Sequence, residues 1–372
     1  MRLAWIALGL TLASSAGCPH KTTEHDKPRR DDAHAVQPGS GAKPAVADAT
    51  GAPSIAALPP APPIPLPPAG LPALPDAPAL AAITPDEVAL GELLFWDGRL
   101  GKDGTTACAT CHDPVHDFSG KVDRTAGGEL NLRRSPSLAN LAWARELAWD
   151  GRFTSIDDLM TAHVRGQLGQ DLAEPMGRLA LLPIYAAHLE RVGGPPDEAA
   201  RKALIAYVLT RYAGDSPWDR LEPSARAPKP GAARDPAVAG YLVFTGKGQC
   251  AVCHTPPLYS DFSYHVVEAG AARDAGRGKV VASLAGAFRT PSLRGAAART
   301  SFLHDGAAQT LEQALDAHLA AGAAGAAQGS DAVAADPALA KLALTPDERA
   351  DVLAFVRALT AEPHAVARPA LP

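Results

Sequence analysis

The amino-acid sequence predicts a mainly α-helical protein, in which a leader rich in proline and alanine precedes two consecutive domains. Beyond the leader, apolar residues recur mostly at helical spacing, and the period-two patterns typical of strands are scarce. A low-complexity break over 222–233 divides the ordered part into halves of similar size. We therefore expect one domain over 84–225 and a second over 232–365, and a chain of 372 residues is long enough for both.

The composition excludes several classes of protein. With 47% apolar and 20% charged residues, the chain has too much apolar and too little charged sequence to be disordered throughout. It holds 35 lysines and arginines against 40 aspartates and glutamates, a net charge of −5, so no nucleic-acid partner is expected. Four of the five cysteines form two C-x-x-C pairs, each followed by histidine, which disfavours a fold held by disulfides.

Residues 1–18 have the features of an export signal. Arg2 precedes an apolar run, 3–13, that is too short to span a bilayer. Small residues then lead to Cys18, as at a bacterial lipoprotein processing site, although Ser15 stands where leucine is usual. We expect an exported protein of the periplasm or cell envelope, with either a lipid on Cys18 as a membrane anchor or plain cleavage near it.

The leader continues as a predicted disordered linker over 19–83. Residues 19–85 hold 16 of the 35 prolines, and this composition favours an extended polyproline-type tether over a helix or a central strand. Such a tether is either a spacer that lifts the domains off a membrane or a leader of no further importance.

Helix signals follow in order along the rest of the chain. Thr84-Pro85-Asp86-Glu87 supplies an N-cap, a proline at the first helical position and two acids at the positive helix end. The same four residues recur from Thr345 and open a last helix that runs to about 360. Between them, helical stripes of apolar residues lie within 156–164, 184–189, 204–209 and 311–319, the last after a capping-box pattern at Thr310.

Two C-x-x-C-H motifs carry the chemistry. They are Cys108, Cys111 and His112 in the first half, and Cys250, Cys253 and His254 in the second. Two cysteines separated by two residues can form thioethers to both vinyl groups of one haem, and the adjacent histidine can ligate its iron. A four-cysteine zinc site would leave both histidines unexplained, and a redox C-x-x-C need not occur twice. We therefore expect two covalently bound c-type haems, one in each domain.

With these motifs in place, the chain resembles the bacterial dihaem cytochrome c peroxidase and MauG family from about 90 to 360. The resemblance rests on sequence blocks in the family's order. They include L-G-E-L-L-F from Leu90, R-S-P-S-L-A-N from Arg134, W-D-G-R from Trp149, F-R-T-P-S-L-R from Phe288 and H-D-G from His304. The family implies two cytochrome-c-like domains that face each other, with Trp149 between the haems.

The sixth ligand of the second iron departs from the family pattern. The family places this ligand on the helix after H-D-G, as methionine in the peroxidases and tyrosine in MauG-type enzymes. The matching residue here is His318, on an apolar face with Leu311 and Leu315. We expect His318 to ligate the iron, the alternative being a histidine packed in the core. Two imidazoles, unlike histidine with methionine, should not raise the iron potential.

The residues expected on the peroxide-binding side of the first haem differ even more from the family pattern. The loop 121–133 contains no displaceable histidine, so the chain resembles members whose first haem is open. His163 occupies the position of the family's distal proline and Gly169 that of its catalytic glutamate, which Glu174 matches if a short insertion is allowed. We predict that Glu174, or His163 with Arg165, moves the protons in peroxide cleavage. His163 could instead ligate the iron, or lie on a helix face without haem contact.

Calcium is a further cofactor of the family, held between the haems by an asparagine. Arg134 stands at that position here, and a cation there disfavours a second one. Backbone carbonyls near Arg289 and Pro291 could still contribute to such a site.

The resemblance implies an exported peroxidase. Electrons from a small redox protein, a cytochrome c or a cupredoxin, would enter at the second haem and pass through Trp149 to the first. There, hydrogen peroxide would be reduced to water, with the haem iron supplying the redox chemistry. The alternatives are a MauG-like oxidase that modifies a residue of a partner protein, and an electron-transfer cytochrome without catalysis, which follows if His163 caps the first iron.

Overall fold

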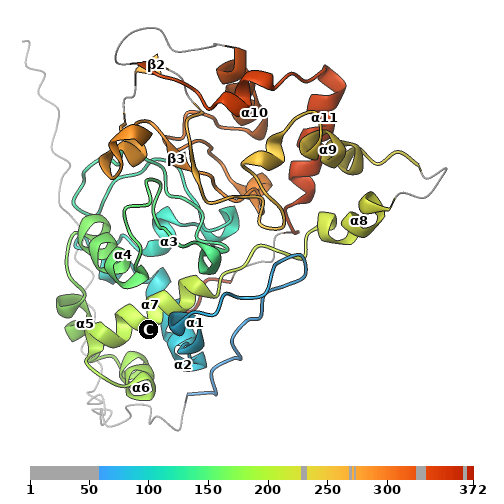
Figure 1. Ribbon diagram of the computed structural model, residues 1–372. Helices are drawn as coiled ribbons and strands as arrows, with labels where there is room; N and C mark the ends of the chain where they lie inside the picture. The colour runs from blue at the N-terminus through green and yellow to red at the C-terminus, as the bar shows by residue number, and fades with distance from the viewer. Residues whose placement is uncertain (1–57, 228–232, 268–269, 272–273, 324–331, 363–366) are drawn as a thin grey trace, which may run out of the picture. The chain divides into compact units, whose positions relative to one another are not determined.

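The computed structural model describes residues 58–227, 233–267, 270–271, 274–323, 332–362 and 367–372. The predicted signal peptide with Cys18, and the predicted linker as far as residue 57, lie outside the described residues. The described part is mainly helical, as the sequence predicts (Figure 1). None of its helices combines the length and the apolar character that crossing a bilayer would take.

The helices of the first half gather around α7, Pro196–Leu209. Four of them contact it: α2 (Pro85–Trp96), α4 (Ile156–His163), α5 (Ala173–Leu179) and α6 (Pro183–Val192), while the short α3 (Cys108–Cys111) contacts α2. Thr84 is the predicted N-cap of α2, and it forms a capping box with Glu87. Leu90 and Leu94 of α2 are fully buried in the core of this half.

The second half is built around two long helices, α9 (Pro236–Thr245) and α11 (Pro346–Ala358), which pack along each other. The helix α8 (Pro217–Arg226) contacts both, so the predicted break over 222–233 begins later than expected. The helix α10 (Leu311–Ala323) packs on a 3₁₀ helix, Pro337–Lys341. Trp218 of α8 and Tyr259 are fully buried in the core of this half, which is separate from the first core.

Each half contains one helix pair that crosses at a glycine. A Cβ on Gly91 of α2 would lie 2.0 Å from the carbonyl oxygen of Ala203 in α7, and a Cβ on Gly240 of α9 would lie 1.9 Å from that of Asp351 in α11. Four residues further along each helix stands an aromatic ring, and the ring centroids within each pair are 5.0 Å apart, Phe95 with Tyr207 and Phe244 with Phe355. The repeated crossing supports two consecutive domains of one kind, whose boundaries stay a prediction.

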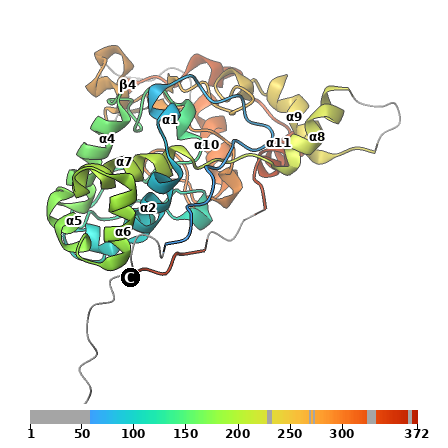
Figure 2. The same cartoon turned by 90° about the horizontal axis from the view of Figure 1, so that it is seen from below.

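The remaining elements are short. The strands form two antiparallel pairs, β1 (Tyr264–His265) with β3 (Phe288–Arg289), and β2 (Gly270–Ala271) with β4 (Ala332–Val333). A four-residue helix, α1 (Pro78–Ala81), precedes α2, and a π-helix over Val164–Leu168 follows α4. The other 3₁₀ helices are Gly98–Leu100, Pro114–His116, Leu141–Trp143, Cys250–Val252, Gly276–Lys279, Ala282–Leu284 and Ala296–Ala298. Seen from below, α2, α5 and α6 lie at one side and α8, α9 and α11 at the other (Figure 2).

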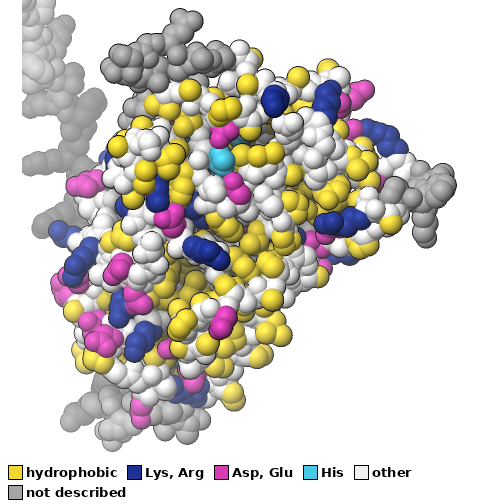
Figure 3. Space-filling model, viewed as in Figure 1, with side chains coloured by type: hydrophobic (Ala, Val, Ile, Leu, Met, Phe, Trp, Pro, Cys, Tyr) yellow, Lys and Arg dark blue, Asp and Glu magenta, His cyan; other side chains and the backbone are white. Residues whose placement is uncertain are grey.

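Residues 58–83 differ from the predicted disordered linker, because they lie against both halves. Proline lacks an amide donor but keeps its carbonyl, and side chains of the two halves donate to carbonyls of this segment. Trp143 of the first half donates to Ala73 at 3.0 Å, and Arg294 of the second donates to Gly70 at 2.6 Å. Hydrophobic side chains are dense across the lower middle of the surface in Figure 3, where Figure 1 draws this segment in blue.

Candidate functional site

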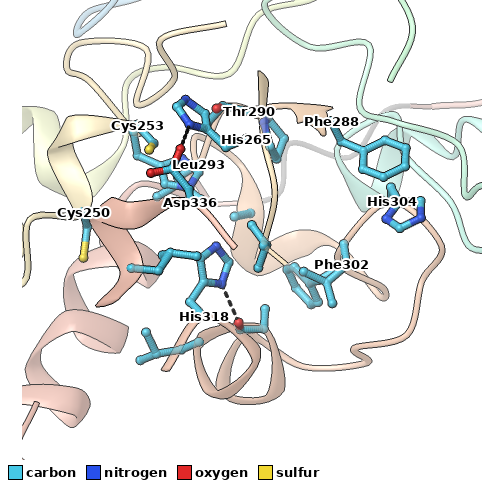
Figure 4. Close-up of a pocket in the computed structure, with 18 of the residues that line it drawn as sticks. Cys250, Cys253, His265, Phe288, Thr290, Leu293, Phe302, His304, His318 and Asp336 are labelled. Atoms are coloured by element: carbon cyan, nitrogen blue, oxygen red, sulfur yellow. Dashed lines mark hydrogen bonds and ion pairs between the residues drawn. The ribbon is translucent and has the colours of Figure 1, made fainter. Parts of the chain in front are cut away.

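The second C-x-x-C-H motif borders a large pocket (Figure 4). The pocket has a volume of about 660 Å³, and cofactor sites typically measure roughly 300–1,000 Å³. Cys250, Cys253 and His254 line it together with His318 of α10. The stripe of apolar residues in α10 therefore turns His318 inward, as the sequence predicts.

The imidazoles of His254 and His318 face each other in this pocket. Their ring centroids are 6.5 Å apart, with an angle of 53° between the ring planes. Nδ1 of His318 donates to the carbonyl of Ala314 at 2.7 Å, and Nδ1 of His254 donates to that of Tyr259 at 3.1 Å. Because Nδ1 carries the proton in both rings, both Nε2 lone pairs are left for a metal. Burial lowers the pKa of His254 to about 4, so that ring is neutral at pH 7.

The first motif builds an equivalent site in the first half. The short helix α3 carries Cys108 and Cys111 directly before His112, which is buried. Nδ1 of His112 lies 3.1 Å from the carbonyl oxygen of Phe118 and 3.0 Å from that of Pro136, so this nitrogen carries the proton and Nε2 is free. Burial lowers the pKa of His112 to about 4, which keeps the ring neutral.

His163, the last residue of α4, faces His112. The two ring centroids are 5.8 Å apart, with an angle of 52° between the planes. Desolvation by the surrounding protein, helped by the nearby His112 and Arg152, lowers the pKa of His163 to about 3. The side chain nevertheless keeps exposed surface. The π-helix Val164–Leu168 begins at the next residue, and such helices are frequent at functional sites.

The other two residues predicted for the distal side lie on the outside of the protein. Glu174 has a 75% exposed side chain and accepts a hydrogen bond from Arg178 at 2.7 Å. The reason is that α5 buries its opposite face, with Met176 in the core. Arg165 is also exposed and pairs with Asp171. This geometry supports His163, and neither Glu174 nor Arg165, as the side chain that faces His112.

Trp149 is buried and connects to both sites. It lines the pocket of the second motif, and its indole N–H donates to the carbonyl of Arg134 at 2.9 Å. Two residues further on, the carbonyl of Pro136 lies 3.0 Å from Nδ1 of His112. The backbone of 134–136 therefore links the indole to His112 through two hydrogen bonds.

A buried cation lies beside this tryptophan. The guanidinium carbon of Arg134 is 4.9 Å from the centre of the Trp149 ring, and Nε donates to the carbonyl of Leu303 at 2.6 Å. Burial, together with repulsion from Arg299, lowers the pKa of Arg134 to about 9, so the group stays charged at neutral pH. A fixed positive charge opposes a second cation nearby.

His265, to which sequence reasoning assigns no role, forms two close contacts with carboxylates. Its Nε2 lies 2.9 Å from Asp261 and its Nδ1 lies 2.6 Å from Asp336. Hydrogen bonds to Cys253, Asp336 and Asp261 raise the pKa of His265 to about 10. His265 therefore ties β1 to the segment before the 3₁₀ helix Pro337–Lys341, at the wall of the second pocket (Figure 4). The sequence held no local signal for this contact, because Asp336 follows 71 residues later.

The donor sets fit two haems better than the alternatives. Each site combines a C-x-x-C pair with two facing imidazoles. Within the described ranges, only Cys253, Asp261 and His265 bring three or more ligand atoms within 4.8 Å of one another. The four cysteines therefore do not form one zinc site.

A mainly helical chain with two C-x-x-C-H motifs, each facing a second histidine, fits a dihaem protein, and comparisons with known proteins give the family. A family model described as "Di-haem cytochrome c peroxidase" matches residues 85–225. The chain is 34% identical over 304 residues to the methylamine utilization protein MauG of Methylorubrum extorquens, covering 78% of this chain and 82% of that protein. The chain belongs to the di-haem cytochrome c peroxidase and MauG family.

Other relatives carry the peroxidase name. The chain is 32% identical over 341 residues to the cytochrome-c peroxidase IdrP1 of Denitromonas iodatirespirans, covering 80% of this chain and 85% of that protein. Among solved structures, a MauG-like protein associated with microbial copper homeostasis superposes with a TM-score of 0.65 at 24% identity, covering 78% of this chain and 95% of that one. The structural match supports the fold. Family membership alone does not choose between peroxide reduction and oxidation of a partner.

Proposed function

We propose that this chain is an exported dihaem c-type peroxidase, which reduces hydrogen peroxide to water with electrons from a small redox protein. The observation that carries the proposal is one buried tryptophan that lines the second site and is linked through the backbone of 134–136 to His112 of the first, and each site pairs a C-x-x-C-H histidine with a second imidazole. When bound, the haems supply the redox chemistry. The residues that would hold them are Cys108, Cys111 and His112 at the first site, and Cys250, Cys253, His254 and His318 at the second.

Electrons enter this proposed enzyme at the second site. Val252, between the two cysteines of the second motif, is 57% exposed, and so is Leu242 of α9. Exposed apolar side chains beside a haem-binding motif suit transient docking of a small cytochrome c or a cupredoxin. From the second site, Trp149 and the backbone of 134–136 provide a route of short contacts to His112.

We assign to His163 the transfer of the proton during peroxide cleavage. Its ring lies opposite His112, with 5.8 Å between the ring centroids, and a nitrogen of an imidazole can accept a proton from the substrate and return it to the leaving oxygen. Arg152 contributes positive charge near this ring. The exposed and ion-paired Glu174 is not retained for this role.

A MauG-like oxidation of a partner protein is the second candidate, and the 34% identity to MauG favours it. Storing oxidising equivalents across the two haems would require positive charge to pass through or rest on the indole between them. The guanidinium of Arg134, 4.9 Å from the Trp149 ring, opposes that charge. We therefore place peroxide reduction first. The same guanidinium leads us to propose that the enzyme needs no calcium.

Export and anchoring remain proposals that rest on the sequence. We propose that residues 1–18 direct the chain out of the cytoplasm, and that a lipid on Cys18 attaches it to the cell envelope. Both features lie outside the described residues.

The test uses the full chain, matured with haem in a host that attaches c-type haems. We expect two haems per chain by pyridine haemochrome, and peroxide consumption that depends on a reduced small cytochrome c or cupredoxin. The Trp149→Phe variant should keep both haems and lose most of the donor-dependent rate. Peroxide consumption that does not need the donor, or none at all, would overturn the proposal. Modification of a co-purified partner protein without peroxide turnover would establish the MauG-like candidate.

A further inference from the structure

The two histidine pairs have nearly the same geometry. The sequence predicted that His318 ligates the second iron and that the first iron keeps an open coordination position. The centroid separations are 5.8 Å for His112 with His163 and 6.5 Å for His254 with His318, and the ring planes meet at 52° and 53°. Two imidazoles bonded to opposite sides of one metal, with bonds of about 2 Å, hold their centroids about 6 Å apart. Both pairs match that spacing.

Hydrogen bonding leaves the rings of the first pair free to share a metal. His112 is tied through Nδ1 to two backbone carbonyls, so its lone pair lies on Nε2. Within the part of the chain that the structure describes, the His163 ring takes part in no hydrogen bond, and its ring contact is with His112. Because the His163 ring also keeps exposed surface, no protein group holds its nitrogen atoms in one orientation, and one of them is free to bind a metal that His112 holds from the other side.

We propose that His163 is the second axial ligand of the first haem, so that two imidazoles hold each iron in the resting protein. This inference rests on the proposed function, because peroxide then reaches the first iron only after His163 leaves it. The exchange breaks one iron–nitrogen bond and forms one iron–oxygen bond to peroxide, with no electron transferred in that step. Once released, the ring remains beside the substrate and serves as the proton acceptor.

The elements around His163 suit a ligand that can be released. The helix α4 has no fully buried residue, whereas α7 buries most of its length. The π-helix Val164–Leu168 follows at once and ends at Gly169, whose φ of +72° favours glycine. The far end of that π-helix is fixed, since the amide of Lys102 donates to the carbonyl of Leu168 at 2.8 Å. The last turn of α4 can therefore shift His163 while the core stays in place.

The experiment is low-temperature EPR and optical spectroscopy of the haem-loaded ferric protein. Wild type should show two low-spin signals and no high-spin signal equivalent to one haem. The His163→Ala variant should convert one haem to high spin and leave the other low-spin, and added imidazole should restore the low-spin signal. His188→Ala, a matched change of a histidine on α6, should leave both signals as in wild type. A wild-type high-spin signal equivalent to one haem would overturn the proposal without the need for any variant, and so would an unchanged spectrum in His163→Ala.

Stopped-flow mixing with peroxide separates this inference from the proposed function. If the open form makes up about 1–10% of the resting protein, His163→Ala should bind peroxide at the first haem about 10- to 100-fold faster. A variant that becomes high-spin and still ignores peroxide would uphold His163 as a ligand and reject the peroxidase. A wild type with an open first haem that reacts at once with peroxide would reject the ligand and uphold the peroxidase.

Discussion

At the residue scale, the group that accepts a hydrogen bond from Nδ1 of each candidate histidine determines its tautomer and therefore which nitrogen can bind a metal. His112, His254 and His318 each have a backbone carbonyl at this nitrogen. That contact fixes the tautomer and turns the Nε2 lone pair toward the metal position. His163 lacks such a partner among the described residues. The three anchored rings are therefore suited to permanent ligation, and His163 to a bond that must break.

The first residue-scale prediction concerns His318. In His318→Ala the second haem should change from a six-coordinate low-spin iron to an open or water-bound iron, because the facing imidazole is lost. His318→Met should keep six ligands and raise the reduction potential, since methionine favours the ferrous iron. Optical and EPR spectra report the coordination, and a redox titration reports the potential. An unchanged spectrum in the alanine variant would remove His318 from the ligand set.

The second residue-scale prediction concerns Arg134 and calcium. Treating the haem-loaded wild type with a chelator should leave its EPR spectrum and peroxide turnover unchanged, because the buried guanidinium already supplies the positive charge beside Trp149. In Arg134→Asn, which exchanges that charge for an amide oxygen, added calcium should alter both signals. Arg145→Asn, at an exposed position, is the matched control and should not respond. Loss of wild-type activity on chelation would contradict the prediction.

At the scale of elements, local signals in the sequence were enough to place most helices. Both Thr-Pro-Asp-Glu segments start helices, as predicted, and the four apolar stripes fall in α4, α6, α7 and α10, of which α7 begins earlier than its stripe. The sequence could not predict the ordered path of 58–83, which depends on donors hundreds of residues away such as Arg294. It also misplaced Glu174, because an assumed insertion aligned the residue without showing which face of α5 is buried. The spacing within the second C-x-x-C-H motif and the offset of His318 from H-D-G are local patterns, and the structure brings these residues to one pocket. Their roles in holding a haem stay predictions.

The element-scale prediction tests the repeated helix crossing. In Gly91→Ala or Gly240→Ala, the new methyl group would meet the backbone of the facing helix at 2.0 or 1.9 Å, so the two helices must separate. Overpacking of this kind costs about 1–3 kcal/mol. Each variant should therefore melt earlier than wild type in thermal denaturation followed by circular dichroism.

The matched control for the crossing is Gly177→Ala. Gly177 lies within α5, and a Cβ there would have no heavy atom within 4 Å. Alanine is the better helix former by about 0.5–1 kcal/mol, so this variant should melt at or above the wild-type temperature. If all three variants melted alike, close approach of the helices would not be the reason for the two glycines.

At the scale of the whole described chain, the two halves are joined by ion pairs with little exposure to solvent. Three pairs connect a residue of the first half to one of the second: Arg133 with Asp274, Glu146 with Arg277, and Asp117 with Arg299. Arg133 also contacts Asp150 at 2.8 Å, in the same W-D-G-R block as Trp149. One of the ion pairs between the halves is therefore connected to the residue that follows Trp149 in the chain. A change in these pairs should affect both stability and electron transfer between the sites.

The whole-molecule prediction is a pH dependence at Asp274. Its carboxylate accepts from Nε of Arg133 at 2.6 Å and from Nη2 at 2.9 Å, and this pairing holds its pKa well below the usual value. A carboxylate with a lowered folded-state pKa stabilises the fold above its unfolded pKa, about 3.9, and this stability is lost as the pH falls toward the folded pKa. Asp274→Asn should therefore cost about 1–3 kcal/mol at pH 7, and the difference from wild type should shrink as the pH falls below about 4.

Urea unfolding of the haem-loaded proteins between pH 7 and pH 3 measures this dependence. Asp171→Asn removes an exposed pair with Arg165 and is the matched control, because exposed ion pairs contribute about 0–1 kcal/mol. The rate of electron transfer from the second haem to the first should fall in Asp274→Asn and stay unchanged in Asp171→Asn. Equal losses of stability in the two variants, or a difference from wild type that stays constant down to pH 3, would show that the Arg133–Asp274 pair does not hold the halves together. The position of Trp149 would then depend on its own backbone contacts, with Arg289 of β3 donating to its carbonyl at 2.9 Å.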